Sequence, residues 1–173
     1  NEVTELESNA RVIDMITGTG FTMAGYPVRS LFSMDFQGLN EEGLPTFINE
    51  KGELTISDID FQERENKDHL VYEGPTDPTI TGSLGNVFSY KNFKLNVFMT
   101  YSFGNVIRLD PVFRASYDDM TALPREFQNR WVTQGDEAYT DIPTIPDSRL
   151  VNLYTSTDMN KLYNAYNYST ERI

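Results

Sequence analysis

Acidic side chains are the first candidates in this chain for metal binding or acid–base catalysis. Asp118-Asp119, Asp136-Glu137 and Asp141 carry carboxylate oxygens, which are the ligands that Ca²⁺ prefers. Their spacing lacks the regular D-x-D-x-D-G order of a calcium loop, so a solvated acidic loop is the better interpretation. Paired carboxylates could also hydrolyse glycosides, but the separation that such a pair needs is set by the fold. The sequence therefore predicts neither a metal nor another cofactor.

Nucleophilic catalysis has few residues to draw on. The chain has no cysteine and a single histidine, His69, which follows the charged run Glu65–Asp68. A Ser-His-Asp triad or a multi-histidine zinc site would depend on that one side chain, so we expect His69 to be an exposed loop residue. The glycines in Gly82–Gly85 form no phosphate loop, because no Gly-Lys-Ser/Thr follows them, and we expect them to relieve crowding or bend a strand. We expect no enzyme activity.

The charge balance bears on partners. The chain has 14 Lys and Arg against 26 Asp and Glu, a formal net charge of −12 at pH 7. Affinity for nucleic acid depends mainly on Lys and Arg that neutralise phosphates, and no basic run offsets the acidic surplus. We therefore expect no nucleic-acid partner.

A regular alternation between residues 93 and 103 is the clearest structural pattern. Apolar side chains occupy every second position: Phe93, Leu95, Val97, Met99, Tyr101 and Phe103. Polar residues lie between them, with Phe98 as the one exception, which predicts a strand with one apolar face. Leu84, Phe88 and Tyr90 continue this phase in a preceding strand, joined by a tight turn at Tyr90–Asn92. About ten residues is the length of a tilted strand that crosses a bilayer, although a soluble sheet with one dry face gives the same pattern.

The residues before this pair predict shorter elements. Val12–Ile16 could be a strand or a short helix. Residues 31–36 and 44–48 should pair as a hairpin around a turn at Asn40–Gly43, and a second turn follows at Asn49–Gly52.

Two further regions read as loops. Residues 55–73 are strongly charged, which predicts a solvated loop. From residue 107 onward, prolines with dense Asp, Asn, Thr and Ser predict a long loop-rich region with short helical turns around Ser116–Phe127 and Ser156–Tyr166.

Three stretches, taken in order, carry a family resemblance. The first runs through Gly25-Tyr26-Pro27-Val28, Phe32, Gln37-Gly38-Leu39-Asn40, Gly43-Leu44-Pro45-Thr46-Phe47 and Asn49-Glu50-Lys51-Gly52-Glu53. The second runs through Gly74-Pro75-Thr76-Asp77-Pro78-Thr79, Gly82, Gly85-Asn86 and Phe88-Ser89-Tyr90-Lys91-Asn92-Phe93-Lys94-Leu95. The third is Arg130-Trp131, Gly135-Asp136-Glu137 and Thr140-Asp141-Ile142-Pro143. In this order and spacing the chain resembles the C-terminal third of SusC/RagA-type TonB-dependent outer-membrane importers.

The resemblance covers nearly the whole chain. The Tyr-Lys-Asn-Phe and Arg-Trp…Gly-Asp-Glu blocks together are specific, whereas either alone would be weak. Two positions depart from the family pattern: Gln134 stands where Pro is common, and Ser83 where a second Gly is frequent.

The resemblance implies a fold and an organisation. Family members have an N-terminal plug and a barrel of about 22 strands, so the chain would be a segment of a longer protein. The implied class is all-β, with antiparallel strands that form part of a 22-stranded transmembrane β-barrel. Residues 1–106 would supply barrel strands and their connections, and residues 107–173 a long extracellular loop region with short helical turns.

The resemblance also implies a function and partners. The chain would be a fragment of a nutrient importer in the outer membrane of a Gram-negative cell, surrounded by outer-membrane lipid. It would work with a SusD-like surface lipoprotein and with the TonB energy-coupling system, and it would take up an oligosaccharide or a peptide. The loop residues expected to meet substrate or partner are Arg130, Trp131, Asp136, Glu137 and Tyr139.

Other interpretations stay open at this point. Trp131 and Tyr139 could stack on sugars or anchor an interface, but a single tryptophan more often packs a loop on itself. A soluble carbohydrate-binding β module is the second functional hypothesis, and a surface-exposed hydrolase is the third.

Overall fold

The computed structural model describes residues 2–6, 9–112, 124–145, 148–154 and 156–173. Its strands are β1 (Ser30–Met34), β2 (Phe36–Leu39), β3 (Pro45–Ile48), β4 (Leu54–Thr55), β5 (Leu70–Pro75), β6 (Ile80–Tyr90) and β7 (Phe93–Phe103). Its helices are α1 (Val12–Ile16), α2 (Ser148–Leu153) and α3 (Ser156–Asn167), with 3₁₀ turns η1 (Arg125–Asn129), η2 (Asp136–Ala138) and η3 (Thr170–Arg172). Within these ranges, no helix combines the length and the apolar character needed to cross a membrane.

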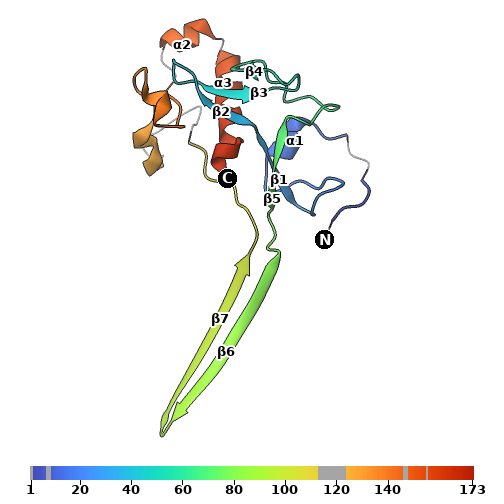
Figure 1. Cartoon of the computed structure of the whole chain (residues 1–173), viewed down its shortest axis with the longest axis vertical. Coiled ribbons are helices and arrows are strands. Elements are labelled where there is room, and N and C mark those ends of the chain that lie inside the picture. Colours follow the sequence, from blue (N-terminus) through green and yellow to red (C-terminus); the bar gives the residue numbers. More distant parts are fainter. Residues whose placement is uncertain (1, 7–8, 113–123, 146–147, 155) are drawn as a thin grey trace.

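Two long strands form a hairpin that extends away from the rest of the chain (Figure 1). β6 and β7 are 11 residues each and pair in antiparallel register from Ile80↔Phe103 to Tyr90↔Phe93. The two residues between them, Lys91 and Asn92, close the turn, and Lys91 has a φ of 50°. Positive φ matches a primed hairpin turn, whose twist suits the flanking strands. The predicted strand and its tight turn are therefore confirmed.

The remaining strands lie in a body at the base of the hairpin. β1 pairs with β5, and β2, β3 and β4 form a three-stranded antiparallel sheet. The predicted turns at Asn40–Gly43 and Asn49–Gly52 are confirmed. In each, the leading asparagine accepts backbone N–H bonds through its side-chain oxygen, and the glycine has a positive φ.

Three of the predictions for this region are wrong. Residues 31–34 do not pair with residues 44–48, because β1 is hydrogen-bonded to β5 and only β2 returns along β3. The predicted loop 55–73 also contains the start of β5 at Leu70, and it buries Ile59 in the core. His69 is half-buried rather than exposed, and this burial lowers its pKa. The charged residues that precede β5 made it look like a loop, because this strand forms only by pairing with the distant β1.

The ambiguous segment Val12–Ile16 is the short helix α1. Asp14 accepts bonds from the backbone N–H of Arg11 and from its guanidinium, which ties the first turn together and lowers the pKa of Asp14 to about 2. Val12 and Ile16 point into the core.

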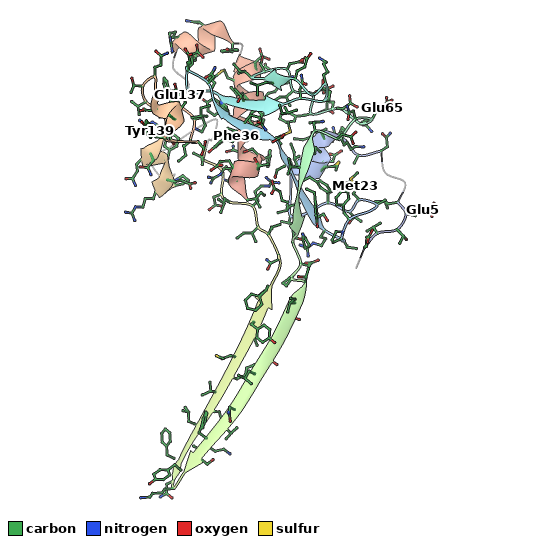
Figure 2. The ribbon with its side chains drawn as sticks, in the orientation of Figure 1. Glu5, Met23, Phe36, Glu65, Glu137 and Tyr139 are labelled. Atoms are coloured by element: carbon green, nitrogen blue, oxygen red, sulfur yellow. The ribbon has the colours of Figure 1, made fainter. Side chains whose placement is uncertain are left out.

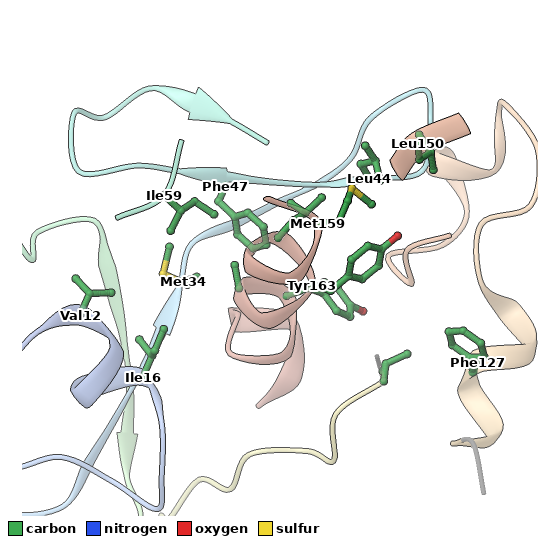
Figure 3. Packing of buried hydrophobic residues seen from close by; sticks show 14 residues of the cluster. Val12, Ile16, Met34, Leu44, Phe47, Ile59, Phe127, Leu150, Met159 and Tyr163 are labelled. Carbon is green, nitrogen blue, oxygen red and sulfur yellow. The ribbon is translucent and has the colours of Figure 1, made fainter. Parts of the chain in front are cut away.

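Helix α3 supplies the centre of the core. Its buried residues Met159, Leu162, Tyr163 and Tyr166 recur at helical spacing and pack with Phe47 of β3 (Figure 3). Immediately after the helix, the carbonyl of Tyr168 accepts the N–H of Met34, which joins β1 to the end of the chain. The region after residue 107 therefore packs into the body, and its predicted helical turn at Ser156–Tyr166 is a helix of three turns.

The described elements are mostly antiparallel β-structure with few helices, as predicted for an all-β class. Of the predicted helical turn at Ser116–Phe127, residues 116–123 lie outside the described residues, and η1 begins at Arg125. In the described part of the chain the strands form three separate sheets and no closed barrel.

Candidate functional site

The register of the hairpin sorts its side chains onto two different faces. Directly opposed residues in an antiparallel pair point to the same side of the sheet. One face carries the pairs Phe93/Tyr90, Leu95/Phe88, Val97/Asn86, Met99/Leu84, Tyr101/Gly82 and Phe103/Ile80. The opposite face carries Lys94/Ser89, Asn96/Val87, Phe98/Gly85, Thr100/Ser83 and Ser102/Thr81. We call the first set the apolar face and the second the polar face.

The apolar face is open along its whole length. Its large side chains are between 40% exposed, at Val97, and 71% exposed, at Tyr90. Figure 2 shows them standing free on the ribbon, with no element of the body beside them. Monomeric soluble proteins rarely expose so long a contiguous apolar surface, and such a surface is typical of a face that contacts another molecule or lipid.

Aromatic residues lie at both ends of the apolar face. Tyr90 and Phe93 flank the turn, and the rings of Tyr101 and Phe103 stack with centroids 5.6 Å apart near the base. Gly82 leaves room for this arrangement, because a Cβ there would overlap the Cζ and hydroxyl end of Tyr101. The prediction that these glycines relieve crowding is confirmed at Gly82. Between the two ends the face is mainly aliphatic.

The hairpin also has two open edges. In the described part of the chain, β6 and β7 pair only with each other, so the outer side of each strand presents backbone N–H and C=O groups without strand partners. Such edges are templates for further strands. An isolated two-stranded hairpin is at best marginally stable in water, so this element needs neighbours that the described chain does not supply.

The second candidate region is the loop that carries the five residues predicted from the sequence. Trp131 is buried at 9% exposure, and its ring lies against Gly43 in the β2–β3 turn. Its backbone N–H donates to Ile142, and its indole N–H donates to Glu137 at 2.8 Å. The indole therefore packs the loop onto the body, and it offers no free ring face for stacking on a sugar.

The two acidic residues of this loop are occupied inside it. Asp136 accepts the backbone N–H groups of Val132 and Thr133. Glu137 accepts from Trp131 and from the N–H of Gly135, and the bond from Trp131 is the main reason why its pKa is lowered. These carboxylates hold the shape of the loop.

Arg130 and Tyr139 are the two of the five residues that are neither buried nor used as hydrogen-bond acceptors within the loop. Tyr139 is 92% exposed, at the outer edge of the body in Figure 2. Arg130 is half-buried, with its guanidinium over the ring of Phe127, and it lines a shallow open hollow together with Asp136 and Tyr139. Contact with a partner or substrate through Arg130 and Tyr139 stays a prediction.

Metal binding finds no support among the residues that the structure describes. Within them, no group of three His, Cys, Asp or Glu side chains could hold an ion. Asp118 and Asp119 lie outside these residues.

Sequence reasoning missed a polar junction at the base of the hairpin. Arg108, which follows β7, donates to the carbonyl of Phe32 at 2.8 Å, and its guanidinium lies over the ring of Tyr168. Glu73 of β5 is the nearby carboxylate, and burial raises its pKa. These residues are far apart in the sequence and follow no motif, so only the β1–β5 pairing brings them together.

Searches against protein-family models and against curated proteins found no match to this chain.

Proposed function

We propose that this chain is part of a SusC/RagA-type TonB-dependent importer and that β6 and β7 are two neighbouring strands of its transmembrane barrel. The observation that carries the proposal is the apolar face of the hairpin, which is open over the full length of both strands. A transmembrane strand alternates between residues that face lipid and residues that face the barrel interior. The two faces of this hairpin divide in the same way, except at Val87 and Phe98, which are exposed apolar side chains on the polar face.

The dimensions of the hairpin support this proposal. Eleven residues at about 3.3 Å each, tilted by about 40°, rise roughly 25–28 Å along the membrane normal. That is close to the apolar band of about 25 Å in outer-membrane barrels. The aromatic residues at its two ends match the girdles that flank such a band. The open edges of β6 and β7 would be paired by further strands of a barrel with about 22.

The two ends of the hairpin suggest an orientation. Periplasmic turns of such barrels are short and extracellular loops are long. The two-residue turn at Lys91-Asn92 would then face the periplasm, and the body would stand at the cell surface. At that position the 130–139 loop, with Tyr139 exposed, would be available to a SusD-like lipoprotein or to a glycan or peptide substrate. The proposal places only β6 and β7 in the membrane, because the shorter strands β1–β5 lie in the body.

Single-cysteine labelling tests the proposal, since the chain has no cysteine of its own. Val97→Cys lies on the apolar face and Thr100→Cys on the polar face, three residues apart in the same strand. Each variant of the membrane-reconstituted importer is labelled with an environment-sensitive dye, and lipids that carry a nitroxide quencher are added. Strong quenching at position 97 and weak quenching at position 100 are expected.

The result that would overturn the proposal is equal behaviour at the two positions. Quenching at neither would place the hairpin in water, and equal quenching at both would deny it a barrel interior. Uptake of substrate should continue in both variants, because each replaces one small or medium side chain within a strand of unchanged register.

A further inference from the structure

A pocket of about 300 Å³ lies where the hairpin joins the body. Two arginines from distant parts of the sequence, Arg29 and Arg108, line it together with the hydroxyl residues Thr19 and Thr76. Leu31 and Ile107 supply apolar wall. In a chain with 14 Lys and Arg against 26 Asp and Glu, two arginines at one cavity stand out. Each has a carboxylate near it, Asp77 for Arg29 and Glu73 for Arg108.

The side chain of Arg29 can exchange its present partner for another anion. Arg29 forms an ion pair with Asp77 at 2.8 Å, and both side chains are about half-exposed. An exposed pair of this kind stabilises little, so another anion can replace Asp77 at small cost. The backbone carbonyl of Arg29 accepts both the N–H and the hydroxyl of Thr76, which fixes the Arg29 backbone beside the hairpin.

The second arginine is more deeply set. Arg108 is half-buried: one Nη donates to the carbonyl of Phe32, and the other donates to the hydroxyl oxygen of Ser33 at 3.5 Å. Its Nε is buried without a partner among the described residues. This Nε has almost no exposed surface, so an acceptor in the pocket would have to reach the remaining Nη hydrogens of Arg108. Guanidinium groups are also suited to phosphate, because they bind it through two parallel hydrogen bonds.

The position of the pocket points to the source of the phosphate. Thr76 follows β5 and Ile107 follows β7, just beyond the last pair of the apolar face, Ile80/Phe103. With the hairpin in a membrane, this junction would lie at the level of lipid head groups. Basic pockets at that depth bind anionic head groups, and the apolar wall at Leu31 and Ile107 suits the start of an acyl chain.

We propose that this pocket binds the phosphate group of an anionic lipid, between Arg29 and Arg108, with Ile107 against the acyl chain. The inference rests on the proposed function, because the hairpin sets the depth of the pocket in the membrane.

Binding of water-soluble dihexanoyl phosphatidic acid to the protein in neutral detergent tests it, measured by calorimetry. Arg29→Gln should weaken binding by about tenfold or more, the effect of losing a hydrogen bond to a charged group. Asp77→Asn should tighten binding, because it releases Arg29 from its ion pair. Arg125→Gln removes an exposed arginine of η1 that is not part of the pocket lining, so it should leave binding unchanged. Circular dichroism confirms that each variant is folded.

Two further ligands separate the sources of the anion. Inorganic phosphate should bind more weakly than the phosphatidic acid, and dihexanoylglycerol, which has no phosphate, should not bind. Phosphate that binds as tightly, with the same dependence on Arg29, would overturn the lipid and leave a site for free anions. Dihexanoylglycerol that binds equally, or affinity unchanged in both Arg29→Gln and Asp77→Asn, would overturn the anion site altogether.

The membrane proposal and the pocket can fail separately. If the Val97→Cys and Thr100→Cys labels differ as expected while phosphatidic acid does not bind, only the pocket is wrong. If the labels behave alike while phosphatidic acid binds with the expected dependence on Arg29 and Asp77, the anion site stands and the membrane position is wrong.

Discussion

Apolar side chains are buried in the body and exposed on the hairpin. β1 is five residues long, and every residue in it is buried. β7 is 11 residues long, and every residue in it is exposed. Both strands are rich in apolar residues. The body buries its apolar residues by its own folding, whereas those of the hairpin stay exposed in the described part of the chain. The difference shows that apolar alternation specifies a strand and does not by itself specify what covers it.

The sharpest test of this contrast is to truncate one phenylalanine in each region. Phe47 is fully buried in the core, and Phe88 is 54% exposed on the apolar face. Phe47→Ala should lower the free energy of unfolding by about 3–5 kcal/mol, because it leaves a cavity. Phe88→Ala should change it by about 0.5 kcal/mol or less, as a surface substitution does. Urea unfolding followed by the fluorescence of Trp131 measures both, and equal losses would mean that the hairpin folds onto the body.

A charge on the hairpin tests what covers the apolar face. Met99 lies near the middle of β7 on that face, opposite Leu84, and Thr100 lies on the polar face opposite Ser83. Met99→Arg should disfavour membrane insertion by about 2–4 kcal/mol, as for a cation at the bilayer midplane on the lipid side of a barrel. Thr100→Arg should have little effect, because its side chain would face the barrel interior. The measurement is the equilibrium between folded protein in vesicles and unfolded protein in urea; similar losses for the two variants would contradict the assignment of faces.

A methyl group added at a turn glycine tests the packing of the loop on the body. Gly43 has a φ of 73°, and a Cβ there would overlap atoms of the Trp131 indole. Gly52 has a φ of 76°, and a Cβ there would meet nothing within 4 Å. Gly52→Ala should cost about 1 kcal/mol for the left-handed backbone alone. Gly43→Ala should cost about 2 kcal/mol or more, because it adds the displacement of the indole. Urea midpoints give both values, and equal costs would show that the indole moves aside freely.

Local pattern was sufficient where neighbours in sequence are also neighbours in space. The alternation of residues 93–103 predicted β7, and the Asn-to-Gly spacing predicted the turns at Asn40–Gly43 and Asn49–Gly52. The pairing of β1 with β5 could not be predicted in this way. Leu70–Pro75 lies behind a charged segment, and its partner is about forty residues away. Nothing local distinguishes β5 from a loop until β1 supplies its hydrogen bonds.

In the candidate site too, features set by sequence neighbours were predictable, and features set by long-range packing were not. The composition of the apolar face followed from the sequence, because a strand fixes which residues share a side. The inward packing of Trp131 needed Gly43, which comes from a separate turn far upstream. The Arg29–Arg108 pocket needed β1, β5 and both ends of the hairpin in place. No spacing rule connects such residues, so only the folded structure could identify the pocket.

The smallest expected effect concerns the carboxylate that holds Trp131 in the body. Hydrogen bonds from the indole N–H of Trp131 and from nearby backbone N–H groups lower the pKa of Glu137 below its ordinary value of 4.5. A lowered pKa in the folded state contributes stability that is present above the ordinary pKa and is lost as the pH falls through the folded one. Glu137 should therefore contribute a fall in the urea midpoint of the unmodified chain between pH 7 and about pH 3. Glu137→Gln should have a slightly lower midpoint at pH 7 and a shallower fall, because an amide does not titrate.

Glu65→Gln, which removes an exposed carboxylate from the loop before β5, should keep the original slope. Parallel curves for Glu137→Gln and the unmodified chain would mean that the bond between Trp131 and Glu137 does not help to hold the loop on the body.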